Sequence, residues 1–313
     1  MLLIQARLAL VGAFRNARGV MDHRDVVFVS VGEGWGEAAP FPGSTSQTVD
    51  DVWESLRSAA PTGVAAAACD EAHVDDEARS AGVLLAGDPA LPLSKAVGLD
   101  DDPGEAAAAA HAAGFGAVKL KIALGADCSR VTAARTAAPD LTIGVDANGG
   151  YPTIDVETFT ELDALGVAYV EQPYAPGNLE AHAALRPLLD CDLALDEDVH
   201  SVADARDVVA AGAADLLVVK PGVLGYTGAL EAYEVAIASG LGIKASGLIE
   251  TSLGRSYTGA LAALPRARYS DLAPASAFLE IDPVRPSAQR AGIGVEPDRD
   301  VLEPLVVREA RVG

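Results

Sequence analysis

The stretch GAVKLKI, residues 116–122, has the length and apolar character of a buried strand, but two of its residues are lysines. Side chains alternate along a strand, so Lys119 and Lys121 point to the same face of the sheet. Burying an ammonium group without a partner is costly. We therefore expect the face that carries these lysines to open onto a polar site with negative partners.

Outward from this strand, the chain alternates short apolar strands with alanine-rich helices. The later strands include TIGVDANGG, VAYVEQP, DLALDED, ADLLVVKPG and GIKASG, and the last one is either 267–272 or 278–281. Repeated βα units require parallel strands with right-handed crossovers. Counting from PLSKAVGL at 92–99, we find eight units, the number that closes a (β/α)8 barrel. An open doubly wound sheet fits less well, because the chain has no glycine-rich dinucleotide fingerprint.

The first 88 residues show a different order of predicted strands and helices. Strand-like segments at 2–11 and 25–32 flank a polar loop at 14–24, and helical stretches follow at about 49–60 and 66–81. This pattern is typical of an α+β unit. The sequence therefore predicts a class α/β protein in which a small α+β domain, residues 1–88, precedes a barrel domain at 89–282.

Five charged residues recur at the ends of successive predicted strands: Lys121, Asp146, Glu171, Asp196 and Lys220. Their spacings are 146−121=25, 171−146=25, 196−171=25 and 220−196=24. Each interval equals one βα unit, so we expect each residue at the same level of its own strand. In a barrel, that level is the C-terminal rim where active sites are built.

The residue types indicate a reaction class. An acid at a strand end often caps a helix, and a lysine at a rim is often solvated, but a set of five is hard to explain in that way. Three converging carboxylates raise one another's pKa unless a cation joins them. Oxygen ligands without His or Cys favour Mg²⁺. A carboxylate substrate could then lose its α-proton to a lysine whose pKa has been lowered.

Short motifs around these residues resemble the enolase superfamily. They are KLK at 119–121, DAN at 146–148, EQP at 171–173, DE at 196–197 and VKP at 219–221. Lys-x-Lys on the second barrel strand resembles the muconate-lactonising-like branch, and the likeness covers nearly the whole chain. VDANGGY, VVKPGVLGY and SGLIETSLG are most similar to the short form of the o-succinylbenzoate synthase family, which serves menaquinone biosynthesis.

For the metal, the resemblance implies that Asp146, Glu171 and Asp196 are Mg²⁺ ligands, with Mn²⁺ able to substitute. Asn148 and Glu197 would orient these ligands. Asp198 stands where family members often have serine, which adds negative charge beside the metal. The resemblance also implies that the tail, about 283–313, returns to the N-terminal unit and completes a capping domain over the barrel.

For the chemistry, the resemblance implies the dehydration of 2-succinyl-6-hydroxy-2,4-cyclohexadiene-1-carboxylate to o-succinylbenzoate. Lys121 would remove the α-proton and then help hydroxide leave as water, while Lys220 stabilises the enediolate from the other side. Lys119 would lower the pKa of Lys121 and meet the negative charge of the substrate.

The expected substrate contacts come from two loops. Arg18 and Met21 lie in the polar loop of the capping domain, which would close over the substrate. The loop after the seventh barrel strand would bind the succinyl carboxylate, although a serine run is common where Ser246-Gly247-Leu248 stands here. Its expected contacts are Ser246, Gly247, Leu248, Ile249 and Glu250.

Other functions remain open at this point. Lysines on both faces of the substrate also suit an N-acylamino acid racemase or a dipeptide epimerase. A dipeptide epimerase usually carries two acids, D-x-D, at the last barrel strand, whereas Asp271 is the one acid in SDLA. A Schiff-base aldolase would need no carboxylate triad, and a non-catalytic binding barrel would tolerate the loss of either lysine.

The composition of the chain excludes some classes of binding partner. A net charge of −22 and a pI near 4.4 argue against nucleic acid. No apolar run reaches about 20 residues, and the N-terminal segment is a poor signal peptide because Arg7 interrupts it. The 3 cysteines form no C-x-x-C pair. We expect a cytoplasmic enzyme that binds a small-molecule carboxylate, and either a monomer or a homo-oligomer fits.

Overall fold

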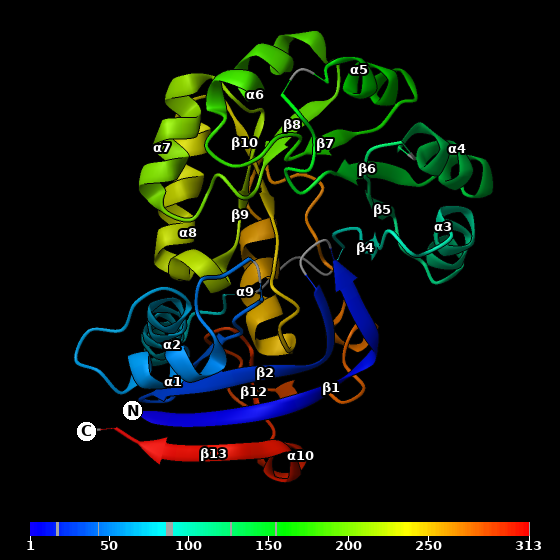
Figure 1. The fold of residues 1–313 in the computed structure, drawn as a ribbon. Coiled ribbons are helices and arrows are strands. Elements are labelled where there is room, and N and C mark those ends of the chain that lie inside the picture. The colour runs from blue at the N-terminus through cyan, green and yellow to red at the C-terminus, as the bar shows by residue number, and fades with distance from the viewer. Residues whose placement is uncertain (17–18, 43, 86–89, 126, 154, 313) are drawn as a thin grey trace.

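The structure, a computed structural model, describes residues 1–313 except 17–18, 43, 86–89, 126, 154 and 313. Two main sheets organise the chain, and Figure 1 shows the antiparallel one below the parallel one. The first residues and the last strand lie together in the antiparallel sheet. Leu2 pairs with Arg311 there.

The antiparallel sheet has the strand order β13-β1-β2-β3. Helix α2 packs against β3 and also contacts α8 of the parallel layer. The elements of this layer are β1 (Leu2–Asn16), β2 (Gly19–Val31), β3 (Gly34–Ala38), α1 (Val49–Leu56), α2 (Val64–Ala81) and β13 (Val306–Arg311). The capping box of Thr48 and Asp51 starts α1, and Gly82 in the left-handed conformation ends α2.

The prediction of a polar loop at 14–24 was wrong for most of its length. Strand β1 continues to Asn16 and β2 begins at Gly19, with Phe14 paired to Met21 and Asn16 to Gly19. The register shifts between Ala9 and Phe14, as it does at a β-bulge. Backbone pairing does not require apolar side chains when one face of a sheet is solvated, so the polar composition was misleading here.

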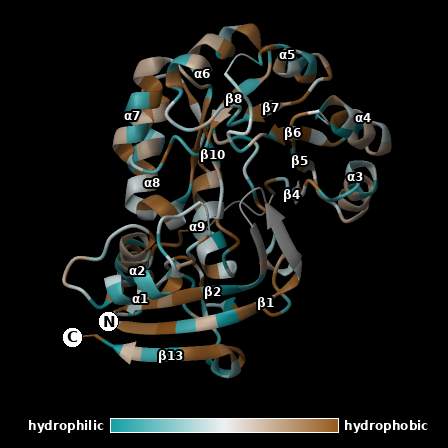
Figure 2. Ribbon diagram, in the orientation of Figure 1, coloured by the Kyte–Doolittle hydropathy of each residue, from teal (hydrophilic) through white to brown (hydrophobic). Residues whose placement is uncertain are grey.

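The parallel sheet has the order β10-β9-β8-β7-β6-β5-β4. Its strands are β4 (Ser94–Val97), β5 (Ala117–Lys121), β6 (Thr142–Asp146), β7 (Tyr169–Glu171), β8 (Asp192–Leu195), β9 (Leu216–Val219) and β10 (Gly242–Ala245). The helices between and after them are α3 (Pro103–Ala112), α4 (Asp127–Ala137), α5 (Glu157–Ala164), α6 (Leu179–Leu185), α7 (Val202–Ala211), α8 (Pro221–Ala238) and α9 (Ser252–Ala262). All four residues of β9 are buried, as both-sided burial in a parallel sheet requires. Figure 2 shows brown, hydrophobic segments within this sheet.

The sheet is curled, and a further segment follows β10 along its edge. Ala267 forms a parallel bridge with Ile243, and the amide of Asp271 donates to the carbonyl of Ala245. By contrast, 278–281 pairs with the antiparallel sheet, where Leu279 bridges Leu10. Of the two alternatives for the last strand, 267–272 is therefore the one that lies beside the parallel sheet. Within the described residues, no strand ladder joins it to β4.

The tail returns across the antiparallel layer. Short strands β11 (Val284–Pro286) and β12 (Val295–Pro297) pair with each other, and helix α10 (Arg299–Leu302) leads into β13. Among the described residues, no helix is long and apolar enough to cross a membrane.

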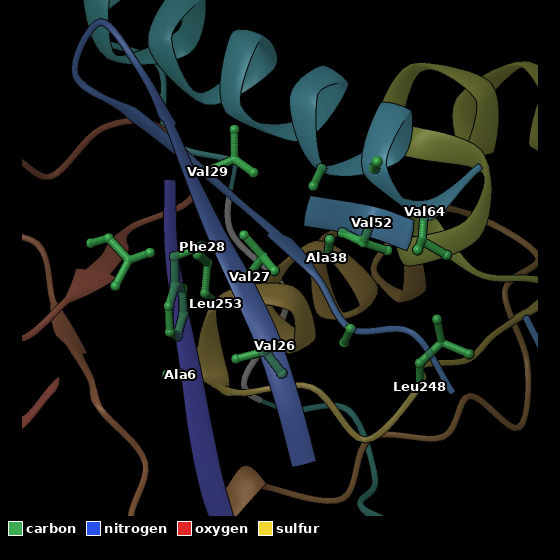
Figure 3. Close-up of a cluster of buried hydrophobic side chains, with 14 of the residues drawn as sticks. Ala6, Val26, Val27, Phe28, Val29, Ala38, Val52, Val64, Leu248 and Leu253 are labelled. Atoms are coloured by element: carbon green, nitrogen blue, oxygen red, sulfur yellow. The ribbon is translucent and has the colours of Figure 1, made fainter. Parts of the chain in front are cut away.

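One hydrophobic core joins the two layers. It contains side chains of β1, β2, β3, α1 and α2 together with Leu248 and Leu253, which follow β10. Figure 3 shows Leu253 close to Val26 and Phe28 of the antiparallel sheet. The loop after β10 is thus fixed from the side of the antiparallel layer, and this contact positions the candidate site.

Candidate active site

Three of the five periodic residues lie at one level of the sheet. Lys121 pairs with Asp146, and Asp146 pairs with Glu171, so the level predicted from the spacing is confirmed for them. Glu171 pairs with Ala194, however, and Asp196 stands two residues further along. The prediction of one common level was wrong for Asp196. It was also wrong for Lys220, which follows β9. A curled sheet staggers its strands, and a two-residue step keeps side chains on the same face.

Lys121 lies at the rim with one carboxylate and one amide as partners. Its Nζ donates to Asp146 Oδ2 at 2.6 Å and to Asn148 Oδ1 at 2.8 Å. The backbone amide of Asn148 donates to Asp146 Oδ1, and its side chain reaches Glu197 Oε1 at 3.2 Å. Asn148 has φ 45°, a conformation that asparagine tolerates better than most residues. The Lys121 side chain is 18% exposed, which leaves its ammonium within reach of a ligand.

Lys220 lies at the N-cap of α8 and pairs with Asp196. Its Nζ is 2.7 Å from Oδ1 and 2.8 Å from Oδ2 of that carboxylate. Burial lowers the pKa of Lys220, but Asp196 and then Glu197 outweigh it, so the pKa is raised. Burial, followed by the charge of Asp196, raises the pKa of Glu197 to about 6. Lys220 is thus a cation that faces a group of acids.

Lys119 lies one layer deeper and contacts three carboxylates. Its Nζ lies 2.9 Å from Glu171 Oε1, 2.8 Å from Asp271 Oδ2 and 3.2 Å from Asp146 Oδ2. Burial lowers its pKa, but Asp271, Glu171 and Asp146 together raise it well above the usual value. The charge of Lys119 is therefore balanced locally, and its influence on Lys121 stays a prediction.

The buried carboxyl groups influence one another. Burial, and then the neighbouring Asp146, raise the pKa of Glu171, which is fully buried. Burial alone would raise the pKa of Asp146. The charges of Lys121 and Lys119 outweigh burial, so the pKa of Asp146 is lowered. Crowded acids of this kind are stabilised by cations.

The donor set fits Mg²⁺ in its chemistry. Asp146, Glu171 and Asp196 supply buried carboxylate oxygens, and Glu171 Oε2 makes no hydrogen bond although Lys244 Nζ lies 3.2 Å away. Lysine ammonium groups pair with all three carboxylates. In the part of the chain that the structure describes, no group of three or more His, Cys, Asp or Glu side chains forms a ready metal cluster. Binding of Mg²⁺ would therefore require these carboxylates to exchange lysine contacts for metal contacts.

A pocket opens above these groups and combines a charged base with an apolar wall. Its apolar lining comes from both layers of the molecule, because Phe41 follows β3 and Phe278 follows the edge segment of the parallel sheet. The lining residues are Phe41, Ser44, Ser94, Ala96, Lys119, Lys121, Asp146, Asn148, Asp196, Glu197, Lys220, Ser246, Gly247, Leu248, Ile249, Arg255, Asp271, Ala273 and Phe278.

The expected substrate contacts divide accordingly. Ser246, Gly247, Leu248 and Ile249 line the pocket. Glu250 and Met21 are not among the lining residues of the described chain, and Met21 instead places its sulfur 3.6 Å from Arg24 Nη1. Arg18 lies outside the described residues.

A buried arginine that the sequence did not reveal holds the pocket wall. The guanidinium of Arg24, on β2, donates to the carbonyls of Ala39 and Pro40 at 2.9 and 2.7 Å. It also donates to the carbonyls of Leu248 and Ile249 at 3.0 and 3.2 Å. Burial lowers the pKa of Arg24 to about 10. Arg24 thus joins the antiparallel layer to the loop after β10 and presents Leu248 and Ile249 to the pocket.

A buried glutamate makes a second link between the layers. Glu37, on β3, accepts hydrogen bonds from the amides of Thr251 and Gly254 at 3.0 and 3.1 Å and from the Thr251 hydroxyl. Thr251 is itself the N-cap of α9. These two amides are therefore used within the protein, and the prediction that this segment binds a substrate carboxylate now rests on Ser246–Ile249.

Two further charged residues were missed as part of the site. Lys244, on β10, and Asp271 continue the strand spacing, since 244−220=24 and 271−244=27. The same spacing, continued for two more βα units beyond Lys220, could have identified Lys244 and Asp271 from the sequence. Lys244 is fully buried, with Nζ 2.5 Å from Asp271 Oδ2. Together with Lys119 and Glu171 they form a charged cluster beneath the pocket, which we call the floor cluster.

Comparison with known families agrees with this arrangement. Residues 103–301 match the enolase C-terminal domain-like family, which is more than half of the chain. The chain belongs to the enolase superfamily. Members of this superfamily are enzymes, and its members bind Mg²⁺.

Curated relatives carry two different activities. An N-succinylamino acid racemase from Amycolatopsis sp is 31% identical over 212 residues, which cover 64% of this chain and 58% of the relative. An o-succinylbenzoate synthase from Bacillus subtilis is 29% identical over 207 residues, which cover 62% of this chain and 56% of the relative. The chain thus spans little more than half the length of the curated relatives it matches. These relatives support a superfamily reaction without deciding which one.

Solved structures support the fold over nearly the whole chain. A dipeptide epimerase from Enterococcus faecalis, in complex with Mg and the dipeptide L-Leu-L-Tyr, has a TM-score of 0.85 and 23% identity. The match covers 94% of this chain and 98% of that one. At this identity the likeness establishes the shared fold, with its parallel curled sheet and separate antiparallel sheet.

Proposed function

We propose that this protein is a Mg²⁺-dependent dehydratase of the o-succinylbenzoate synthase type, a hydro-lyase of menaquinone biosynthesis. The observation that carries the proposal is a pair of partly exposed lysines, Lys121 and Lys220, which line one pocket with the buried carboxylates of Asp146 and Asp196. The third carboxylate, Glu171, is fully buried and pairs with the lining residue Lys119. The substrate would be 2-succinyl-6-hydroxy-2,4-cyclohexadiene-1-carboxylate. The apolar wall of the pocket suits its ring.

Lys121 is the proposed base and then acid. Its ammonium contacts Asp146 and Asn148. Because Asp146 would hold the metal ion, Asn148 would be the partner that orients Lys121. A neutral Lys121 takes the α-proton, and the resulting ammonium returns a proton to the departing hydroxide on the same face. One residue can thus serve both steps of a syn elimination.

Lys220 is the proposed electrostatic partner from the other side of the pocket. Its raised pKa keeps it protonated, which suits a group that meets negative charge and does not remove a proton. Asp146, Glu171 and Asp196 would hold Mg²⁺, or Mn²⁺ in its place. When bound, the ion would supply positive charge to the substrate carboxylate. Asn148 and Glu197 would hold the ligand groups in place.

An N-acylamino acid racemase is the second candidate, because two lysines could exchange the α-proton from opposite faces. A dipeptide epimerase has less support. Asp271 is the carboxylate that could bind a substrate ammonium. It already forms ion pairs with Lys119 and Lys244 and accepts a hydrogen bond from the Ser246 hydroxyl. A substrate without a free α-ammonium suits this pocket better.

The test compares both reactions on one preparation. We expect dehydration of the cyclohexadiene precursor with Mg²⁺ and its loss after chelation. Lys121→Ala should lower the dehydration rate by about 10³-fold while Mg²⁺ still binds. Unchanged dehydration by this variant would exclude the assigned role.

Deuterium exchange distinguishes the two candidates. In a racemase, Lys121→Ala and Lys220→Ala each abolish exchange at the α-carbon of one enantiomer of an N-succinylamino acid and leave the other. In the proposed dehydratase, the wild type turns over the cyclohexadiene precursor faster than it racemises the N-succinylamino acid. Racemisation without any dehydration would overturn the proposal in favour of the second candidate.

Two structural expectations accompany this function. We propose that the segment 267–272 completes a closed (β/α)8 barrel over residues 89–282. We also propose that 1–88 and about 283–313 act as one capping domain. The hydrogen bonds of Asp271 to β10 and of Leu2 to β13 support these assignments.

A further inference from the structure

The floor cluster holds more charge than the proposed reaction requires. Lys119 and Glu171 belong to the motifs around the site, but Lys244 and Asp271 have no assigned role. Lys244 is fully buried, and its Nζ lies 2.5 Å from Asp271 Oδ2 and 3.2 Å from Glu171 Oε2. A buried ammonium is costly unless it is paired, so this position demands an explanation.

The backbone shows why Lys244 and Lys119 meet. Lys244 pairs with Val218 on β9, and Lys119 pairs with Gly144 on β6. Each of these positions is one inward-facing layer below the rim. Both ammonium groups reach the single oxygen Asp271 Oδ2, at 2.5 and 2.8 Å. Asp271 therefore bridges two lysines that approach from opposite parts of the curled sheet.

Aromatic packing keeps the cluster in place. The Tyr169 ring lies 5.4 Å from Lys244 Nζ and stacks on Tyr269 below it. Gly144 leaves the room for that ring, because a Cβ there would overlap it. The Lys244 side of the cluster is thus enclosed by side chains, whereas Lys119 and Asp271 line the pocket. Coulomb interactions are strong where the charges are buried.

The charges of Lys244 and Asp271 indicate what this pair does. Lys119 and Lys244 balance Glu171 and Asp271 one for one. If Lys244 were absent, Asp271 and Glu171 would share Lys119, and the floor would carry one additional negative charge. If Asp271 were absent, Lys244 would keep Glu171 as its carboxylate partner and Lys119 would keep Glu171 and Asp146, and the floor would carry one additional positive charge.

We infer that Lys244 and Asp271 are a matched positioning pair that sets the charge beneath the metal site and thereby the affinity for Mg²⁺. This inference rests on the proposed role of Glu171 as a metal ligand. Asp271 draws Lys244 and Lys119 toward itself, so that Glu171 can release them when a divalent cation binds. The Ser246 hydroxyl, 2.9 Å from Asp271 Oδ2, connects the same carboxylate to the pocket wall.

The experiment is a double-mutant cycle on the full chain with Lys244→Met, Asp271→Asn and the double variant. Mg²⁺ affinity is measured by titration calorimetry without substrate, and Tm by thermal unfolding. We expect the two single variants to change affinity in opposite directions. Lys244→Met should bind Mg²⁺ at least about threefold more tightly, and Asp271→Asn at least about threefold more weakly.

Stability gives a second readout. Each single variant leaves a buried charge with fewer partners and should lose about 5 °C or more in Tm. The double variant removes both charges, so its Tm should exceed that of either single variant and its Mg²⁺ affinity should return to within about twofold of wild type. If Lys244→Met does not fold, the comparison of Asp271→Asn with the double variant still tests the pairing.

A control pair and a contrary result complete the test. Arg268 and Asp192 form a partly exposed ion pair 3.1 Å apart at the other end of the sheet. Arg268→Met and Asp192→Asn should leave Mg²⁺ affinity unchanged. A purely structural floor would weaken affinity in both Lys244→Met and Asp271→Asn, or change it in neither, and either result overturns the inference. Mg²⁺ binding without any dehydration would instead contradict the proposed function alone.

Discussion

Buried charge is handled differently in two regions of this molecule. Arg24 and Glu37 connect the two layers, and we call this pair of residues the joint. Both bind peptide groups: the arginine binds four carbonyls and the glutamate binds two amides. In the floor cluster, side chains of opposite charge bind one another. Lys119, for example, contacts three carboxylates.

The pKa shifts follow this difference. At the joint, burial prevails: it lowers the pKa of Arg24 to about 10 and raises that of Glu37 to about 7. In the floor cluster the partners outweigh burial at two groups, because they raise the pKa of Lys119 and lower that of Asp271, whereas burial and Asp146 raise the pKa of Glu171 to about 7. Peptide partners fix the geometry of a buried charge without neutralising it, whereas an opposite charge keeps both groups ionised. Near neutral pH, Glu37 of the joint should therefore respond to pH, whereas Lys119 and Asp271 of the floor cluster should stay ionised.

The largest effect is expected at the joint. Arg24→Met removes the donor for four carbonyls, and we expect the free energy of unfolding to fall by about 4 kcal/mol. The substrate KM should rise more than kcat falls, because Leu248 and Ile249 lose their support. Denaturant unfolding and steady-state kinetics measure both effects. A loss below about 1 kcal/mol would mean that the carbonyls find other partners.

The next effect is a pH dependence of stability. Between pH 4.5 and about 7 the folded state keeps a proton on Glu37 that the unfolded state has released. Stability from this group is therefore lost as pH rises through that window, by about 3 kcal/mol in total. Glu37→Gln should flatten this part of the curve of unfolding free energy against pH. An unchanged slope would assign the dependence to other acids, of which Glu71 is the nearest candidate, since its pKa is also raised by burial.

A smaller loss is expected in the layer of the floor cluster. In Gly144→Ala the new Cβ overlaps the Tyr169 ring, so the ring must move from its place beside Lys244. We expect a loss of about 2 kcal/mol in the free energy of unfolding. Gly12→Ala is the matched control, because nothing lies within 4 Å of the added carbon there. Equal stability of the two variants would show that the ring is loosely held.

The smallest effect is expected for a charge pair on the surface. Arg285 and Glu296 lie 3.1 Å apart on β11 and β12, and the arginine side chain is 55% exposed. Arg285→Gln should change stability by about 0.5 kcal/mol or less, and less still in 1 M salt. A loss as large as that of Gly144→Ala would mean that exposure does not separate weak from strong charge pairs here.

The repeat of 24 to 25 residues was enough to predict the parallel strands and the level shared by Lys121, Asp146 and Glu171. The stagger of Asp196 was not predictable from it, because spacing along the chain does not report the register between strands. Lys244 was not predicted for a different reason: it lies inside β10, whereas Lys121, Asp146 and Glu171 each end a strand.

Arg24 left no signal at all in the sequence. Its partners Leu248 and Ile249 are 224 and 225 residues away, and they contribute backbone atoms that any residue type would supply. The polar loop was misread because strands, like loops, can carry polar residues. Long-range contacts to the backbone are thus the part of the site that pattern reading misses.

Pairing of β1 with β13 has a consequence for synthesis. Residues 2–6 are made long before their partners at 306–311, so the antiparallel sheet cannot be completed until that later segment has been synthesised. The parallel strands, by contrast, pair with neighbours made shortly before them. A nascent chain could therefore pair the strands that carry Lys121, Asp146 and Glu171 before the antiparallel sheet gains its edge strand β13.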